Sequence, residues 1–169
     1  MAVETIHVAG AILIGVGATL ATDLWALFLK RTFNLPSLSY CLVGRWLLHM
    51  PAGIFTHGSI AAAPRKRHEC AVGWIAHYAI GALFALVFIG LVSVSWLARP
   101  TILPAVLFGL GTVVFPFFLM QPSLGFGVAA AKTPKPAQAR LKSLMTHSVF
   151  GFGLYAFAVG LSHVLRIHA

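Results

Sequence analysis

Four long apolar segments are the feature that most constrains how this chain of 169 residues can fold. They cover about residues 6–29, 71–97, 101–120 and 144–165. Each is close to the roughly 20 apolar residues with which an α-helix crosses a hydrocarbon core of about 30 Å. Only 9% of the residues are charged, against roughly 25% in ordinary soluble domains. We therefore predict a single all-α integral membrane domain, residues 1–169, built as a bundle of four transmembrane helices.

The basic residues are distributed as membrane topology requires, so the net charge of +9 does not indicate a nucleic-acid partner. Ten of the 12 lie in the two long connections, as Lys30, Arg31, Arg45, Arg65, Lys66 and Arg67 and then Lys132, Lys135, Arg140 and Lys142. Because basic connections stay cytoplasmic, we expect both long connections inside and both termini outside. Basic side chains there can also contact anionic headgroups, so membrane lipids are the expected partners.

The two cysteines, Cys41 and Cys70, both fall on the predicted cytoplasmic side. Structural disulfides are rare in that reducing compartment, so none is expected here. Two cysteines without a CxxC spacing are also a weak signal for a metal site.

The second and fourth segments share a motif that indicates an internal repeat. One reads HYAIGALFALVFIGL from His77 and the other HSVFGFGLYAFAVGL from His147. The first and third segments share a shorter Gly-x-Gly motif, at Gly15 and Gly109. The pattern suggests two parallel helix-hairpin repeats, related by an axis along the membrane normal. Glycines also let membrane helices pack closely, so most of them need no functional reason.

Three ionisable side chains inside the segments, Asp23, His77 and His147, form a predicted polar layer. Counted from the nearest charged residue at 1.5 Å per residue, they lie about 8 to 12 Å from the cytoplasmic surface. Such groups are costly in a membrane and usually face the bundle interior. Asp23 is the only acidic residue in any segment, and a lone buried carboxylate protonates, pairs with a cation or binds a metal.

A bound metal ion or haem is the leading functional hypothesis from this layer. Two histidines related by the repeat would lie at equal depth and face one another. Their imidazoles could then be the two axial ligands of a haem. For a divalent transition metal, His77, His147, Asp23 and either His49 or His57 would supply nitrogen and oxygen ligands.

Two alternatives use the same residues without a metal. An Asp–His relay could carry protons in a transporter or channel-like subunit, and with only four spans such a carrier would have to be a homo-oligomer. In a structural or assembly subunit, Asp23 would only pair with a histidine or with Arg45, and this pair would fix the packing of the helices.

The segment GRWLLHMPAGIFTHGSIAAAP, residues 44–64, is too polar to span a membrane and too apolar for an ordinary solvated loop. We predict an interfacial amphipathic helix here, ended by Pro51. Arg45 and Trp46, with Gln121 from the end of the third segment, would form a lid or second layer beneath the site. In the alternative interpretation, Arg45 and Trp46 anchor the helix among the headgroups, and the two histidines of this segment face sideways.

The connection QPSLGFGVAAAKTPKP raises a weaker possibility. Gly125 and Gly127, followed by Lys132, could shape an anion-binding nest of backbone amides. A membrane enzyme acting on a lipid headgroup would use Lys132 and Arg45 to hold phosphate. Nucleophile-elbow and HExxH motifs are absent from the sequence, so enzymatic activity stays open.

The motif GRWLLHM, the pattern of Gly73, Trp74, His77, Tyr78 and Gly81, and the motif QPSLGFGVAAAKTP resemble a known family. It is a family of small bacterial integral membrane proteins with four predicted spans, described only as a domain of unknown function. The resemblance covers nearly the whole chain and implies a location in the bacterial inner membrane. It implies no activity and no catalytic residue.

Overall fold

A computed structural model describes the chain from residue 2 to residue 167, with side chains from residue 7 to residue 164. Within residues 2–167 the regular structure is entirely helical. The α-helices are α1 (Ala2–Phe33), α2 (Tyr40–His49), α3 (Glu69–Val92), α4 (Ile102–Gly111), α5 (Gln121–Ser123) and α6 (Pro136–Ile167). Four segments are long and apolar enough to cross a membrane: His7–Phe33, Glu69–Val92, Ile102–Ser123 and Pro136–Val164. The prediction of a four-span helical membrane protein, with a shorter helix between the first two spans, is confirmed.

The second and fourth helices differ in extent from the apolar segments that predicted them. α3 ends at Val92 rather than near residue 97, because Ser93 adopts a positive φ of 75° and a short 3₁₀-helix, Val94–Leu97, follows. α6 begins at Pro136, eight residues before the predicted start at residue 144. A proline is well suited to the first position of a helix, where no backbone N–H is needed. Hydropathy marks the apolar part of a helix, and α6 continues beyond that part.

The third span is interrupted near its middle. α4 stops at Gly111, and a stretch of π-helix runs over Pro116–Met120 before α5 completes the span. Proline removes a backbone donor and its ring clashes with the preceding turn, and π-bulges are common where a helix is kinked. The break falls where the sequence FPF at residues 115–117 predicts a kink.

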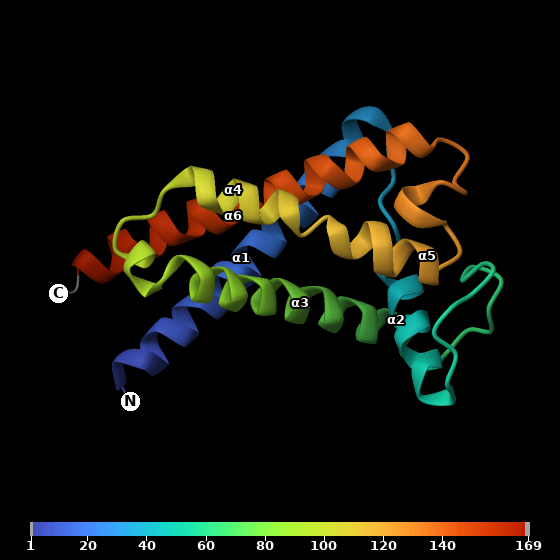
Figure 1. Cartoon of the computed structure of the whole chain (residues 1–169), viewed down its shortest axis with the longest axis horizontal. Helices are drawn as coiled ribbons and strands as arrows, with labels where there is room; N and C mark the ends of the chain where they lie inside the picture. The colour runs from blue at the N-terminus through green and yellow to red at the C-terminus, as the bar shows by residue number, and fades with distance from the viewer. Residues whose placement is uncertain (1, 168–169) are drawn as a thin grey trace.

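α1 packs against both α3 and α6, and α6 packs in turn against α4. Figure 1 shows both chain termini at one end and α2 and α5 at the other. Within each hairpin the two helices cross at glycines. In the first hairpin, a Cβ on Gly15 would lie 2.6 Å from the Gly81 carbonyl oxygen. A Cβ on Gly151 would lie 2.5 Å from the Ala105 carbonyl oxygen. Gly81 and Gly151 are matched positions of the sequence repeat, so equivalent glycines make equivalent helix crossings.

The outward faces of the spans are strongly apolar. Large side chains such as Leu13, Leu83 and Leu107 remain 62%, 56% and 58% exposed. A soluble protein rarely exposes a continuous apolar surface of this kind. Membrane embedding explains it, and lipid contact follows.

The two long connections pack on each other at the end of the bundle opposite the termini (Figure 1). The backbone N–H of His57 donates to the Ser123 carbonyl at 2.9 Å, and that of Ile60 donates to the Leu124 carbonyl at 3.1 Å. A small apolar core lies beneath them, formed by Val43, Trp46, Ile60 and Leu124. This end is therefore a folded cap on the bundle rather than a pair of loose loops.

Candidate functional site

The Asp23 carboxylate accepts hydrogen bonds from three side chains that lie on two other helices. The His77 Nε2 lies 3.0 Å from Oδ1, and the Tyr78 hydroxyl donates to Oδ2 at 2.8 Å. The Tyr40 hydroxyl donates a longer bond of 3.4 Å to Oδ1. We call these four residues the Asp23 cluster. It joins α1, α2 and α3 at the point where the first two spans meet the cap.

The Asp23 cluster is enclosed by aromatic rings but is not sealed. The Tyr40 ring stacks on the His77 imidazole at 4.0 Å between centroids, and Trp74 packs edge-on against Tyr40 at 4.7 Å. Burial, and then the neighbouring Asp23 charge, raise the pKa of Tyr40, which keeps its hydroxyl a neutral donor. The exposed fraction of the side chain is 17% for Asp23 and 19% for His77. The pair is thus largely, but not completely, buried.

His147 lies apart from the Asp23 cluster, although the sequence repeat matches it to His77. Its Nδ1 is 2.7 Å from the Thr112 hydroxyl, which donates to the Gly109 carbonyl at 2.5 Å and so accepts from the imidazole. α6 packs against α4 over this region. Each of the two histidines therefore contacts the partner helix of its own hairpin, and His147 does so at Thr112, where α4 ends.

The predicted ligand set does not gather around one point. Among the residues whose side chains are described, no group of three or more His, Cys, Asp or Glu side chains is placed to hold a metal ion. Asp23 and His77 would supply two ligands. Binding of a metal ion or haem therefore stays a prediction from the sequence.

His49, the last residue of α2, and His57, in the connection that follows, contact each other. Their rings meet edge to face at 5.2 Å, and the His49 Nε2 lies 3.1 Å from the Pro64 carbonyl oxygen. Both ring nitrogens of His57 are buried without a hydrogen-bond partner among the described residues. The two histidines face each other inside the cap, so neither of the predicted orientations, toward Asp23 or toward headgroups, describes them.

Arg45 and Trp46 are buried and form hydrogen bonds within the cap. The Arg45 guanidinium pairs with both carboxylate oxygens of Glu69, through Nε at 2.9 Å and Nη2 at 2.8 Å. Its Nη1 donates to three carbonyls of the following connection, those of Ile60, Ala61 and Ala63. The hydrogen bonds to Glu69 raise the pKa of the Arg45 guanidinium above its ordinary value. Trp46 Nε1 donates to the Phe55 carbonyl at 2.8 Å. Arg45 thus pairs with Glu69 and not with Asp23.

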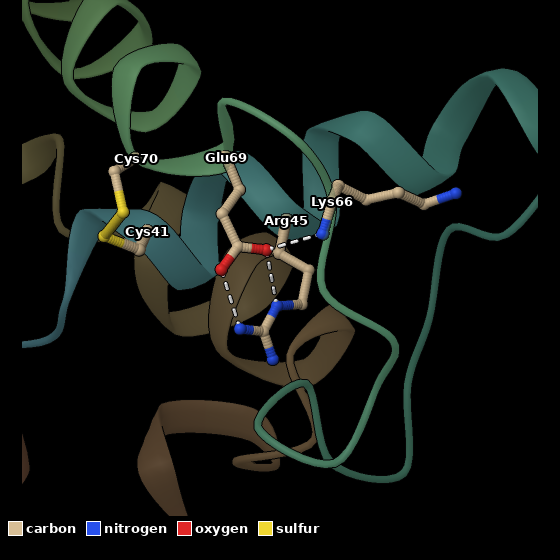
Figure 2. Close-up of a disulfide and its surroundings, with 5 residues drawn as sticks. All are labelled: Cys41, Arg45, Lys66, Glu69 and Cys70. Atoms are coloured by element: carbon tan, nitrogen blue, oxygen red, sulfur yellow. Dashed lines mark hydrogen bonds and ion pairs between the residues drawn. A yellow bond between two sulfur atoms is a disulfide. The ribbon is translucent and has the colours of Figure 1, made fainter.

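Cys41 and Cys70 form a disulfide, so the expectation of two unlinked cysteines is wrong (Figure 2). The reason is a very close crossing of α2 and α3. A Cβ on Gly44 would overlap the Glu69 carbonyl, and one on Gly73 would overlap the Tyr40 carbonyl. Each glycine follows a cysteine by three residues, so each cysteine lies one turn before the crossing. The repeated Cys-x-x-Gly pattern is the sequence signal that could have revealed the bridge.

The remaining predicted residues lie in the connection after the third span. Gln121 is buried and donates to the Ser143 hydroxyl at 3.4 Å. Gly125 and Gly127 have positive φ angles of 92° and 74°, which favour glycine. A Cβ on Gly125 would overlap the Gly58 carbonyl, and Lys132 packs close to Gly127. Backbone shape and close packing account for both glycines, and the anion-binding nest stays a prediction.

No curated protein and no solved structure is similar to the chain. A family model does match, and it covers residues 12–160, which include most of the four spans, the Asp23 cluster and the cap. The resemblance drawn from GRWLLHM and the neighbouring motifs is confirmed. The chain belongs to the family described as "Protein of unknown function (DUF2938)".

Proposed function

We propose that the protein translocates protons across the membrane, as a transporter or channel-like subunit, and that the Asp23–His77 pair is its proton-binding site. The observation that carries the proposal is this pair itself, a carboxylate and an imidazole 3.0 Å apart on two membrane-spanning helices. Ionisable groups inside spans are expensive and commonly mark proton relays. Asp–His contacts suit that role because imidazole exchanges a proton near neutral pH.

The hydrogen bonds around Asp23 suggest how a proton would be handled. The ionised carboxylate is stabilised by donors from His77, Tyr78 and Tyr40. Protonating it removes the charge that these donors solvate, so the contacts of α1 with α2 and α3 weaken together. The rings of Tyr40 and Trp74 limit water at the pair. Proton uptake is thereby coupled to helix packing at one end of the bundle.

Proteoliposomes carrying a pH gradient and an internal pH-sensitive dye test this proposal. Wild-type protein should dissipate the gradient, and Asp23→Asn should reduce the rate to that of protein-free liposomes. His163→Gln is the matched control, because this histidine is exposed on α6 outside the Asp23 cluster. Unfolding in detergent is measured in parallel. Unchanged flux in Asp23→Asn, or no flux in wild type, rejects the proposal, whereas a loss of stability alone favours a structural pair.

A further inference from the structure

We infer that the Cys41–Cys70 pair is a redox-active site that undergoes reversible thiol–disulfide exchange with a dithiol protein of the thioredoxin class. This activity is separate from the proton site and does not depend on it. The inference rests on the position of the two sulfurs, on the charges around them and on the other contacts that hold α2 to α3.

Both cysteines lie at helix N-termini. Cys41 is the second residue of α2 and Cys70 the second residue of α3, and the two helix starts meet at the disulfide. The partial positive charge of a helix N-terminus favours a thiolate over a thiol. A cysteine that is stable as a thiolate is a good leaving group in thiol–disulfide exchange.

The local charges act in the same direction. Arg65, Lys66 and Arg67 lie within five residues of Cys70 in the connection that leads into α3. Glu69, the acid that precedes Cys70 in the chain, is paired elsewhere, because its carboxylate binds Arg45 and also accepts the Lys66 backbone N–H at 2.9 Å (Figure 2). The segment that leads into Cys70 therefore carries a net positive charge.

The two cysteines differ in exposure. Cys70 is exposed, whereas Cys41 is partly buried at the start of α2. The proposed exchange therefore begins with attack of an incoming thiolate on Cys70, with Cys41 as the leaving group. This asymmetry is typical of exchange-active pairs, in which one sulfur is attacked and the other resolves.

The disulfide is not the only contact that holds α2 against α3. Gly44 and Gly73 bring the two backbones into contact, and Arg45 ties α2 to Glu69 and to the connection between them. These contacts would keep α2 against α3 when the bond opens. A disulfide whose helices are also held by other contacts is a candidate for reversible chemistry.

The charge distribution of the chain predicts a cytoplasmic position for this end. Disulfides there are uncommon, and most of those that occur are transient, catalytic or redox-sensing. A static bridge is expected only if this end faces an oxidising compartment. The two possibilities differ in a property that can be measured, the fraction of the pair that is reduced in the cell.

The exchange balances as two consecutive displacements. A thiolate of the reduced partner attacks the Cys70 sulfur, the Cys41–Cys70 bond breaks, and Cys41 leaves as a thiolate that takes up a proton. The second thiol of the partner loses its proton and attacks the mixed disulfide at the partner's own sulfur, which releases Cys70 as a thiolate that takes up a proton. Two electrons and two protons pass from the partner dithiol to this chain, and the reverse exchange restores the bridge.

Acid quenching of cells followed by alkylation with a maleimide-linked polyethylene glycol tests the state of the pair in the full-length protein. We expect the pair to be largely reduced in growing cells and to become oxidised after treatment with diamide. A pair that stays oxidised in untreated cells, or that diamide cannot oxidise, overturns the inference.

Purified protein in detergent provides the second measurement. Oxidised wild type is mixed with thioredoxin, thioredoxin reductase and NADPH, and one NADPH should be consumed per chain while the protein remains folded by circular dichroism. The Cys41→Ser/Cys70→Ser double variant is the control and should consume none. A wild-type disulfide that thioredoxin leaves intact in the folded protein identifies a structural bridge and rejects the proposed exchange.

Discussion

Replacing Arg45 with alanine should destabilise the cap more than any other single loss of charge. The guanidinium donates to the two carboxylate oxygens of Glu69 at 2.9 and 2.8 Å, and hydrogen bonds to charged groups contribute about 1.5–3 kcal/mol each. Only 6% of the Arg45 side chain and 12% of the Glu69 side chain are exposed, so solvent screens the pair little. Leaving one partner of a buried pair uncompensated costs about 3–5 kcal/mol. We expect a loss of that size in the free energy of unfolding.

Unfolding in mixed detergent micelles, followed by circular dichroism, measures this loss. The experiment is run with the disulfide intact and after reduction, because the bridge also ties α2 to α3. Arg67→Ala is the matched control, since this arginine is exposed in the same basic connection. The Arg45→Ala/Glu69→Ala double variant should lose less than the two single variants added together, because it leaves no unpaired charge.

The outcome that would refute this reasoning is specific. If Arg45→Ala costs no more than Arg67→Ala, within about 0.5 kcal/mol, both before and after reduction, the Arg45–Glu69 pair does not stabilise the cap. If the double variant shows simple additivity, the two side chains do not act as a pair.

Further changes probe the helix crossing, the Asp23 cluster and the bridge. Gly73→Ala should destabilise the protein and slow disulfide formation, measured by alkylation, because its Cβ overlaps the Tyr40 carbonyl, whereas Gly90→Ala in the same helix should be tolerated. Tyr78→Phe should cost about 1.5–3 kcal/mol in detergent unfolding, since it removes a hydrogen bond to a charged group. Tyr40→Phe should cost less, since its bond to Asp23 is 3.4 Å against 2.8 Å. Reducing the disulfide should lower the free energy of unfolding by about 3–4 kcal/mol, the loop-entropy value for cysteines 29 residues apart; no change on reduction would contradict that.

The spans could be predicted from the sequence because hydropathy is a local property. A run of apolar residues is stable in lipid only as a helix that satisfies its own backbone, whichever neighbours it finds. The helix ends were less predictable, since α3 ends at a residue with positive φ and α6 extends into a basic segment. Neither feature changes the hydropathy of the apolar run.

The pairing of polar groups was only partly predictable. Asp23 and His77 meet as one of the predicted alternatives, because the first two spans form a hairpin and a buried carboxylate needs a donor. His147 was expected in the same layer from its match to His77. Sequence matching gives depth along a helix but not the identity of the facing helix, and α6 faces α4 and Thr112 instead.

The predicted compartment argues against the disulfide, whereas the close approach of α2 and α3 allows it to form. Two glycines, each three residues after a cysteine, allow α2 and α3 to touch, and that contact brings the sulfurs together. The sequence contained this information in CLVG and CAVG, residues 41–44 and 70–73. Redox compartment predicts whether a bond persists, and close approach predicts whether it can form.

Two of the three motifs that carry the family resemblance lie at the crossing of α2 with α3. GRW supplies the crossing glycine and the arginine of the ion pair, and Gly73, His77 and Tyr78 supply the opposing glycine and two donors to Asp23. Tyr40 links the crossing to the Asp23 cluster, because it precedes Cys41 in the chain and its ring stacks on the His77 imidazole. Cys41 of the bridge and Tyr40 of the Asp23 cluster are therefore adjacent residues in the first turn of α2.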